Sequence, residues 1–421
     1  ERNEEVWSKN QPRLLAAKGS FHGKTLGSLQ ITYKSDYRIP FIGDNCHADF
    51  FALNEESIRS AIDEGSFSFF LPVVDEQGNV SVDSVSFNRY SALFIEPILG
   101  EGGVHIVEDE HLRLMRELCT DHGIQLCFDE IQSGFFRTGE FLASSSSGVA
   151  ADCYVLGKSL GGGLTKIGAT MVERDFYDGD FGVLHTSTFA EDDLSSIVAT
   201  RALEVTRENR ELIAKRGTYL KDRLHQLHEK YPDVITDHRG RGLMQAIDFK
   251  DFSNSRSGAW QILARTGYYN YVISGFLLAN HGVRVAAPLS TKATVRIQPS
   301  MMVSEGEIDL LCTALEDLCQ VIRSQDAYKF LEFTFDEHLR GRRLEPQDFS
   351  LGEISLEEPV AGATKVGFVV HFVDKLVRFN EPSLFVLNDS DIENMLADFI
   401  PVAKPMVVAQ KNIRSADGSV V

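Results

Sequence analysis

Two short apolar runs, Ile124–Phe128 and Cys153–Leu156, constrain the fold of this chain more than any other feature of its sequence. Both runs are rich in strand-forming residues and are bounded by glycine or charged residues, which is typical of strands buried in a sheet. Asp129 follows the first run directly, and Lys158 follows the second after one glycine. Ligands of open α/β sheets bind in the crevice beyond the carboxyl ends of the strands. We therefore expect one acid and one amine to face the same crevice.

An acid and an amine at one sheet edge are the groups that a pyridoxal phosphate site needs. A buried lysine with a lowered pKa can form a Schiff base, and a carboxylate can hold a protonated ring nitrogen. The chain between Asp129 and Lys158 is long enough for one crossover between parallel strands. Taken singly, Asp129 would more simply cap a turn and Lys158 would lie on the surface. Together, and flanked by glycines, they favour a cofactor site.

The segments FDEIQSGFFRTG and LGKSLGGG contain this pair. They resemble motifs of the class III aminotransferases, the ornithine and omega-amino acid branch of the fold type I pyridoxal phosphate enzymes. The resemblance covers roughly residues 10–325. It implies an α/β protein with a mostly parallel sheet in a large domain, a carboxyl-terminal α+β small domain, and a homodimer with shared active sites. It also implies an aminotransferase that moves an amino group from a glutamate-type donor to an aldehyde or keto acceptor.

The resemblance assigns roles to five residues near the predicted cofactor. Lys158 would hold pyridoxal phosphate as a Schiff base and move the proton, and Asp129 would keep the ring nitrogen protonated. Gln132 would hydrogen-bond the phenolic oxygen of the ring. In the segment LAAKGSFHGKTLGSLQIT, Phe21 would stack on the ring and His22 would lie beside it.

Three more residues are implied by later motifs. Thr188, in HTSTFAEDDLSS, would reach the cofactor phosphate of the partner subunit. Glu101, in SALFIEPILGEGG, would pair with the carboxylate-binding arginine, whose place is taken by Arg296. The chain departs from the family where Phe136 replaces a glycine and where residues 190–192 replace glycine–glycine–asparagine. Substrate specificity therefore cannot be carried over from the family.

The order of the motifs predicts four segments. These are a cofactor-binding large domain over residues 1–205, a small domain over 206–330, a linker over 331–365 and the start of a further module over 366–421. The last segment weakly resembles the first strands of long-chain acyl-carrier-protein reductases. The family's serine–glycine–alanine turn, which holds the cofactor phosphate, is not in this sequence. We therefore expect the chain to be a fragment.

Hydrophobic periodicity and the resemblance together predict several elements outside the two central strands. Helices are expected over residues 109–122, with Asp109 as the cap, over 305–324, and as a pair over 193–231. Residues 45–90 carry no motif that we can interpret. Strands of the small domain are implied for residues 239–249, 280–288 and 294–304.

Composition excludes several classes of partner. The formal net charge of −19 argues against nucleic acid or an anionic membrane, because both need a basic face. No apolar run approaches the roughly 18 residues of a membrane helix, and no signal peptide opens the chain, so we expect a cytoplasmic protein. The six cysteines show no zinc-binding spacing and are expected to be buried. No metal site is expected.

Three alternatives to an aminotransferase remain open. An aminomutase or racemase of the same fold would use the same lysine and acid, and one sequence does not separate these activities. A second alternative is a reductase fusion in which the aminotransferase part is a non-catalytic scaffold. The third is a pseudoenzyme, because the phosphate-binding turn is missing from the sequence.

Overall fold

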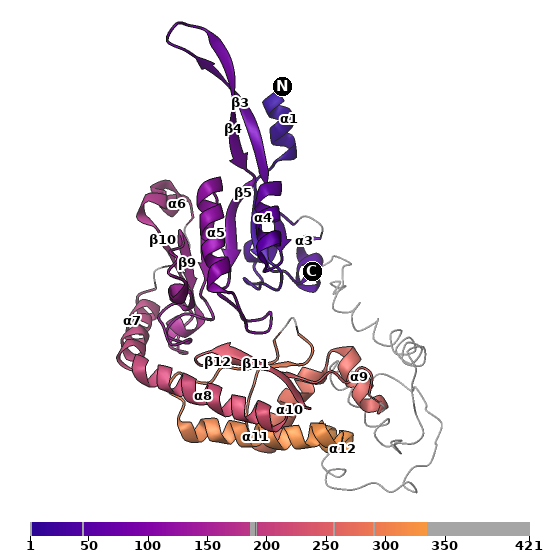
Figure 1. Cartoon of the computed structure of the whole chain (residues 1–421). Coiled ribbons are helices and arrows are strands. Elements are labelled where there is room, and N and C mark those ends of the chain that lie inside the picture. The colour runs from indigo at the N-terminus through magenta and orange to yellow at the C-terminus, as the bar shows by residue number, and fades with distance from the viewer. Residues whose placement is uncertain are drawn as a thin grey trace, which may run out of the picture. The chain divides into compact units, whose positions relative to one another are not determined.

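The computed structural model describes residues 2–43, 46–185, 190, 192–255, 257–288 and 291–334 (Figure 1). By internal contacts the chain divides into two compact units. Unit 1 comprises Glu1–Lys230, Asp237–Ile247 and Ala286–Leu310, and unit 2 comprises Tyr231–Thr236, Asp248–Val285 and the chain from Leu311 onward. The four-segment division of the sequence stays a prediction, and its segment 366–421 lies outside the described residues.

Unit 1 is built on a six-stranded sheet with the order β10-β9-β8-β5-β1-β2. All neighbouring strands are parallel except β9 and β10, which are antiparallel. The expected mostly parallel sheet is confirmed, and the two apolar runs form its neighbouring strands β8 and β9. The strands are β1 (Arg13–Ala17), β2 (Ala48–Phe51), β5 (Tyr90–Ile95), β8 (Gln125–Asp129), β9 (Cys153–Leu156) and β10 (Ala169–Val172).

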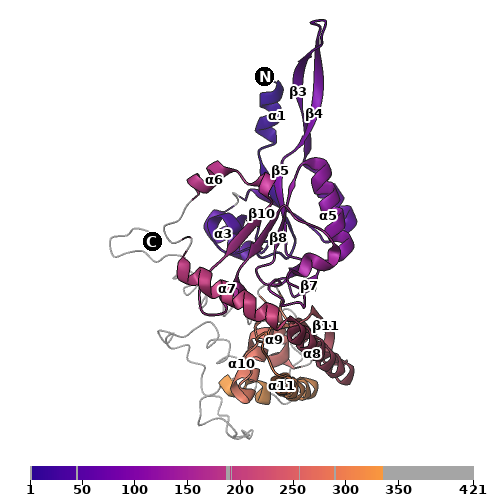
Figure 2. The same ribbon diagram turned by 90° about the vertical axis from the view of Figure 1, so that its left-hand side faces the viewer.

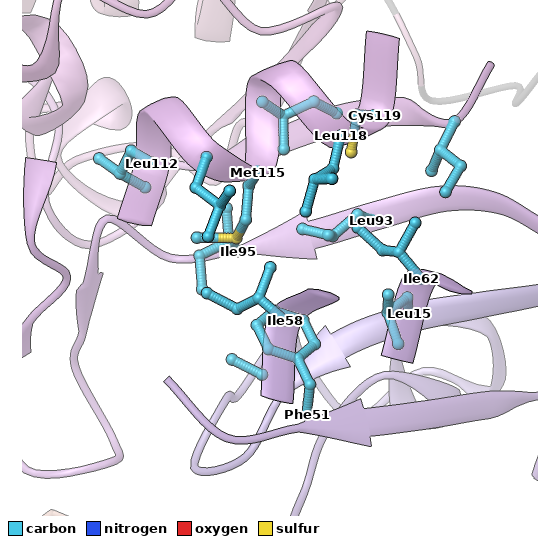
Figure 3. Packing of buried hydrophobic residues seen from close by; sticks show 14 of the residues in the cluster. Leu15, Phe51, Ile58, Ile62, Leu93, Ile95, Leu112, Met115, Leu118 and Cys119 are labelled. Carbon is cyan, nitrogen blue, oxygen red and sulfur yellow. The ribbon is translucent and has the colours of Figure 1, made fainter. Parts of the chain in front are cut away.

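Helices bury both faces of this sheet, which explains why its strands are apolar runs. Figure 3 shows α5 (Asp109–His122) placing Met115 against Ile95 of β5 and Leu118 near Leu93 of the same strand. The helix α4 (Glu55–Glu64) adds to the same cluster. On the opposite face, residues beside α2 (Leu26–Gln30) pack on β1 and β2. The range expected for α5 is confirmed, but the expected cap is wrong. Glu108 occupies the N-cap and Asp109 lies in the first turn.

A long β-hairpin occupies much of the region without an interpretable motif. It consists of β3 (Ser66–Val74) and β4 (Val80–Asn88), which pair along their whole length. Both views show it extending beyond the sheet with α1 (Arg2–Lys9) alongside (Figures 1 and 2). The Asn3 side chain bonds the backbone of Phe70 in both directions, at 2.9 Å.

The rest of unit 1 includes two long helices and several short elements. The expected helix pair over residues 193–231 is confirmed as α7 (Asp193–Glu208) and α8 (Arg210–Lys230). Asp192 caps α7 by accepting a 2.7 Å hydrogen bond from the Ser195 amide. Other elements are α3 (Ser35–Ile42), β6 (Ile98–Leu99), β7 (His105–Ile106), the short turn Arg174–Phe176 after β10, and α6 (Gly179–Leu184).

A second, three-stranded sheet follows α8 in the order β11-β12-β13. Its strands are β11 (Ile235–Arg241), β12 (Met244–Phe249) and β13 (Thr294–Ile297). The strand implied for residues 280–288 is wrong. Residues 280 and 281 end helix α10 (Tyr269–His281), Gly282 adopts the left-handed conformation that terminates it, and Ala286 makes only an isolated bridge to Arg296.

Unit 2 contains an aromatic core between its helices. Trp260 of α9 (Gly258–Thr266) stacks on Phe330 of α12 (Ala327–Leu331) with ring centroids 4.8 Å apart. The helix α11 (Glu305–Ser324) has the range expected from periodicity. No helix in the described part of the chain is long and apolar enough to cross a membrane.

Candidate functional site

Three parallel neighbouring strands, β5, β8 and β9, deliver ionisable side chains to the same edge of the sheet in unit 1. Glu96 follows β5, Asp129 ends β8, and Lys158 follows β9 after one glycine. Parallel strands have their carboxyl ends at one edge, so the backbone itself gathers these groups. The structure therefore brings Asp129 and Lys158 to the same edge, as the sequence predicts.

Lys158 opens a short 3₁₀ turn and has a positive φ of 47°. A side chain other than glycine is strained in this left-handed region, and such strain is common at functional positions. The residue is accessible to solvent, yet protein atoms around its amine desolvate the charge and lower its pKa. The carboxylates of Glu96 and Glu101 oppose that shift. A lowered pKa increases the fraction of neutral, nucleophilic amine.

Asp129 is buried and held on both sides. Its Oδ2 lies 2.8 Å from His22 Nδ1, and its Oδ1 accepts a 3.0 Å hydrogen bond from the Ile131 amide. An ionised carboxylate only accepts, so Nδ1 is the donor of the first contact. The other ring nitrogen of His22, Nε2, is buried and has no hydrogen-bond partner among the described residues. A buried polar atom of this kind needs an explanation, and a missing ligand is one.

Arg296 and Glu101 form an ion pair in unit 1. Arg296 Nη1 lies 2.5 Å from Glu101 Oε1, and each side chain is only about a tenth exposed, at 10% and 11%. The two residues are 195 positions apart in the chain. The pairing implied by the family resemblance is therefore present in the folded chain.

Gln132 connects this ion pair to the lysine. With its amide turned so that the oxygen faces the cations, that oxygen lies 3.1 Å from Lys158 Nζ and 3.3 Å from Arg296 Nη1. Gly100 makes room for the side chain, because a Cβ at position 100 would lie 1.3 Å from the other terminal atom of the Gln132 amide group. One amide thus contacts both cations of the site.

Glu96 is the acid that sequence reasoning missed. It is 5% exposed, and burial raises its pKa to about 7. Its carboxylate accepts hydrogen bonds from the Phe21 amide at 2.8 Å and the Gly100 amide at 3.1 Å. The signal that would have found it is the one used for Asp129, an acid placed directly after a buried apolar strand.

Phe21 and Thr188 are the remaining predicted site residues. Phe21 is half-buried, and its ring meets Tyr37 edge-on with centroids 6.4 Å apart, so its stacking role stays a prediction. Thr188 lies outside the described residues.

Phe136, at the family glycine, has a φ of 62° and packs on Phe141. The backbone there keeps a conformation that favours glycine although the residue is phenylalanine. Within the described ranges no three or more His, Cys, Asp or Glu side chains are grouped as a metal site would require.

Comparison with known proteins identifies relatives of this arrangement. The family model for class-III aminotransferases matches residues 2–319. The ornithine aminotransferase of Toxoplasma gondii ME49 is 21% identical, with a TM-score of 0.59, over 75% of this chain and 66% of that one. The N-acetylornithine aminotransferase of Stenotrophomonas maltophilia K279a is 22% identical, with a TM-score of 0.53, over 77% and 70%. These likenesses confirm the fold class predicted from the sequence.

Proposed function

Because the chain belongs to the class-III aminotransferase family, whose members use pyridoxal phosphate, we propose that it moves an amino group from a glutamate-type donor to an aldehyde or keto acceptor. Lys158 holds the cofactor covalently in this proposal. The observation that carries it is the cluster at one sheet edge, in which Gln132 contacts both Lys158 and the Arg296–Glu101 pair. The chain spans 66% of the Toxoplasma enzyme, so activity and substrates are proposed for this chain and not transferred.

The residues at the edge fit the cofactor. In this proposal the buried acid Asp129 would supply the negative charge that a protonated ring nitrogen needs. His22 holds that acid in place and leaves one buried nitrogen without a partner in the described part of the chain. Lys158 offers an amine whose pKa is lowered by burial. Pyridoxal phosphate, when bound, supplies an electron sink next to the reacting carbon.

The protein moves the proton with groups that are already in place. Lys158 Nζ can accept a proton from the substrate carbon and return it to a different carbon. Desolvation lowers the pKa of this amine and so increases the neutral fraction that can accept a proton. Glu96 and Glu101 stabilise the ammonium while it holds the proton. The Gln132 oxygen, 3.1 Å away, fixes the direction of the amine. Proton transfer is thus assigned to Lys158. Glu96 and Glu101 influence the charge of its amine, and Gln132 orients it.

The ion pair accounts for two kinds of substrate. An amino donor with an α-carboxylate can bind the planar guanidinium of Arg296 through two hydrogen bonds, once Glu101 moves aside. An aldehyde has no carboxylate, and an arginine without a partner in a closed site would be unfavourable. In that half-reaction Glu101 stays on Arg296, as it does in this structure. One site can therefore serve a charged donor and an uncharged acceptor.

Isotope transfer tests this proposal directly. The purified full-length protein is loaded with cofactor and given ¹⁵N-glutamate with a separate aliphatic aldehyde or keto acid. We expect the label in the amine formed from the acceptor. An aminomutase would move nitrogen only within one molecule, so an unlabelled acceptor alongside an isomerised amino compound would contradict aminotransfer. Arg296→Ala should weaken use of glutamate far more than use of the aldehyde, and equal losses would contradict the role of the ion pair.

We also propose that the chain acts as a homodimer. Large apolar side chains are exposed on α6, at the start of α7 and in the loop before β10, including Leu164, Val183, Leu184, Leu194 and Ile197 at 66–85% exposure. In this proposal a second subunit covers part of this exposed apolar surface. Sedimentation equilibrium should give twice the chain mass, and Ile197→Glu should shift the population toward monomer. A monomer at every concentration of the unaltered protein would contradict the proposal.

A further inference from the structure

Glu96 joins two backbone segments that come from different parts of unit 1. Its Oε1 accepts a hydrogen bond from the Phe21 amide, which follows β1. Its Oε2 accepts one from the Gly100 amide, which follows β6. The carboxylate is buried at the end of β5, which pairs directly with β1. Each oxygen therefore holds a different segment.

The two segments also touch each other. A Cβ at Gly102 would lie 2.8 Å from the carbonyl oxygen of Gly19, so the backbones approach too closely for any side chain there. The first segment carries Phe21 and His22, the residues expected beside the cofactor ring. The second carries Glu101, which pairs with the arginine of the site. Glu96 thus lies between the two halves of the candidate site.

We propose that Glu96 is a positioning residue: it clamps the Phe21 segment and the Gly100 segment in one arrangement and so couples the hold on the cofactor ring to the hold on the substrate carboxylate. What the site binds rests on the proposed function. The clamp itself rests only on the two hydrogen bonds and the backbone contact. It predicts that loss of the carboxylate affects both segments together, although they are far apart in the sequence.

Burial and several ionisable groups around Glu96 act on its ionisation in opposite directions. His22 approaches from the segment after β1, Asp129 from β8 and Lys158 from the turn after β9. His22 and both backbone amides stabilise the ionised carboxylate, whereas Asp129 and burial oppose it. Hydrogen bonds to an ionised acceptor are stronger than those to a neutral one. The clamp is therefore tightest when Glu96 is ionised.

The variant Glu96→Gln tests the clamp because it keeps the size of the side chain and leaves one oxygen acceptor for two amides. Amide hydrogen exchange is measured on the cofactor-free protein by NMR or by mass spectrometry. We expect faster exchange, by roughly ten- to a hundredfold, in the segments containing Phe21 and Gly100. The Leu126 amide, which is held by Asp152, serves as an internal reference and should not change.

Asp49→Asn is the matched control. Asp49 accepts hydrogen bonds from Arg13 and Tyr90 near the amino ends of β1, β2 and β5, at the opposite edge of the same sheet. Its loss should lower the melting temperature without changing exchange at the two clamped segments. If Glu96→Gln does not fold, Glu96→Asp keeps the charge but is too short to hold both amides, and the same exchange pattern is expected.

A second readout links the clamp to binding. In Glu96→Gln the dissociation constant of pyridoxal phosphate and the KM for glutamate should both rise about tenfold, while Asp49→Asn leaves both unchanged. Unchanged exchange at both segments in Glu96→Gln, or the same changes in Asp49→Asn, would overturn the proposal. If the unaltered protein shows no aminotransfer, the proposed function fails, but the exchange data still decide whether the clamp exists.

Discussion

Strands β3 and β8 are both apolar runs that lead into an aspartate, yet the two acids have different surroundings. Asp129 ends β8 in a sheet whose two faces are covered, and it is 7% exposed. Asp75 follows β3 in the hairpin and is exposed; it accepts hydrogen bonds from Asn79 and from the Gln77 amide, which lower its pKa. The first acid faces a lysine and a histidine, whereas the second shapes a turn.

The comparison shows that burial of the strand, and not the acid itself, creates a reactive position. A strand covered on both faces delivers its last residue to a place with little water, where charges interact strongly. A strand exposed on both faces, as most of β4 is, delivers its last residue to solvent. The following predictions test this contrast, beginning with the largest expected effect.

Lys158→Ala removes the only lysine that the sequence and the site geometry assign to the cofactor. We expect aminotransfer to fall by at least roughly a thousandfold, because no other amine in the site takes over covalent attachment. Turnover with glutamate and peptide mapping after borohydride reduction measure the effect. A reduced cofactor adduct on a different lysine would show that the buried edge is not the attachment site.

Phe128→Ala and Val82→Ala compare the two kinds of strand by stability. Phe128 is fully buried in β8 next to Tyr154, so its truncation should reduce the free energy of unfolding by about 3–5 kcal/mol. Val82 is 66% exposed in β4, and its truncation should change it by less than about 0.5 kcal/mol. Urea denaturation measures both. Similar losses would mean that the hairpin has a covered face in solution.

Asp129→Asn and Asp75→Asn compare the two acids by catalysis. Asparagine keeps the shape of Asp129 but not its charge, so we expect transition-state stabilisation to fall by about 2–4 kcal/mol. Asp75→Asn should leave kcat/KM within error, because the turn lies on the exposed hairpin. Full activity of Asp129→Asn would show that another group supports the ring nitrogen.

Glu96 gives the buried edge a pH dependence that the hairpin lacks. Burial raises its pKa from 4.5 to about 7, so between these values the folded protein binds a proton more tightly than the unfolded chain. This carboxyl therefore stabilises the fold at low pH, and its contribution falls as pH rises through that window. The loss amounts to at most about 3 kcal/mol. Denaturation curves from pH 4.5 to 8 should show a shallower decline for Glu96→Gln, and parallel curves would contradict the shift.

Short-range patterns predicted the part of the fold that is buried and regular. The runs that became β8 and β9 and the periodicity of α5 and α11 each reflect one local environment repeated along an element. The hairpin was not predicted because Phe69, Phe70 and Leu71 are apolar on both faces, which removes the alternation typical of a half-buried strand. Helix α10 was not predicted for a similar reason. Apolar residues surround most of this helix, so its sequence lacks the one-sided periodicity of a half-buried helix.

The site was predictable only where an ionisable residue lies at or just after the end of a buried strand. Asp129 and Lys158 could be found by this rule, and Glu96 also satisfies it. The pairing of Glu101 with Arg296 spans 195 positions, and no local pattern relates residues so far apart, so only the family resemblance implied it. The two hydrogen bonds that Glu96 accepts depend on how loops fold back, which spacing does not encode.

Gly100 couples two positions of this chain, because the space beside it is filled by the Gln132 amide. Any other residue there places a Cβ on the Gln132 amide, which is the flexible end of its side chain and can swing away. Folding would then be nearly unaffected, while the amide would leave Lys158 and Arg296. For the smallest such change, Gly100→Ala, we expect little change in the free energy of unfolding and a clear loss of activity. With a smaller residue at position 132, a Cβ at position 100 would no longer meet the amide, so the effect of a change at position 100 depends on the residue at position 132.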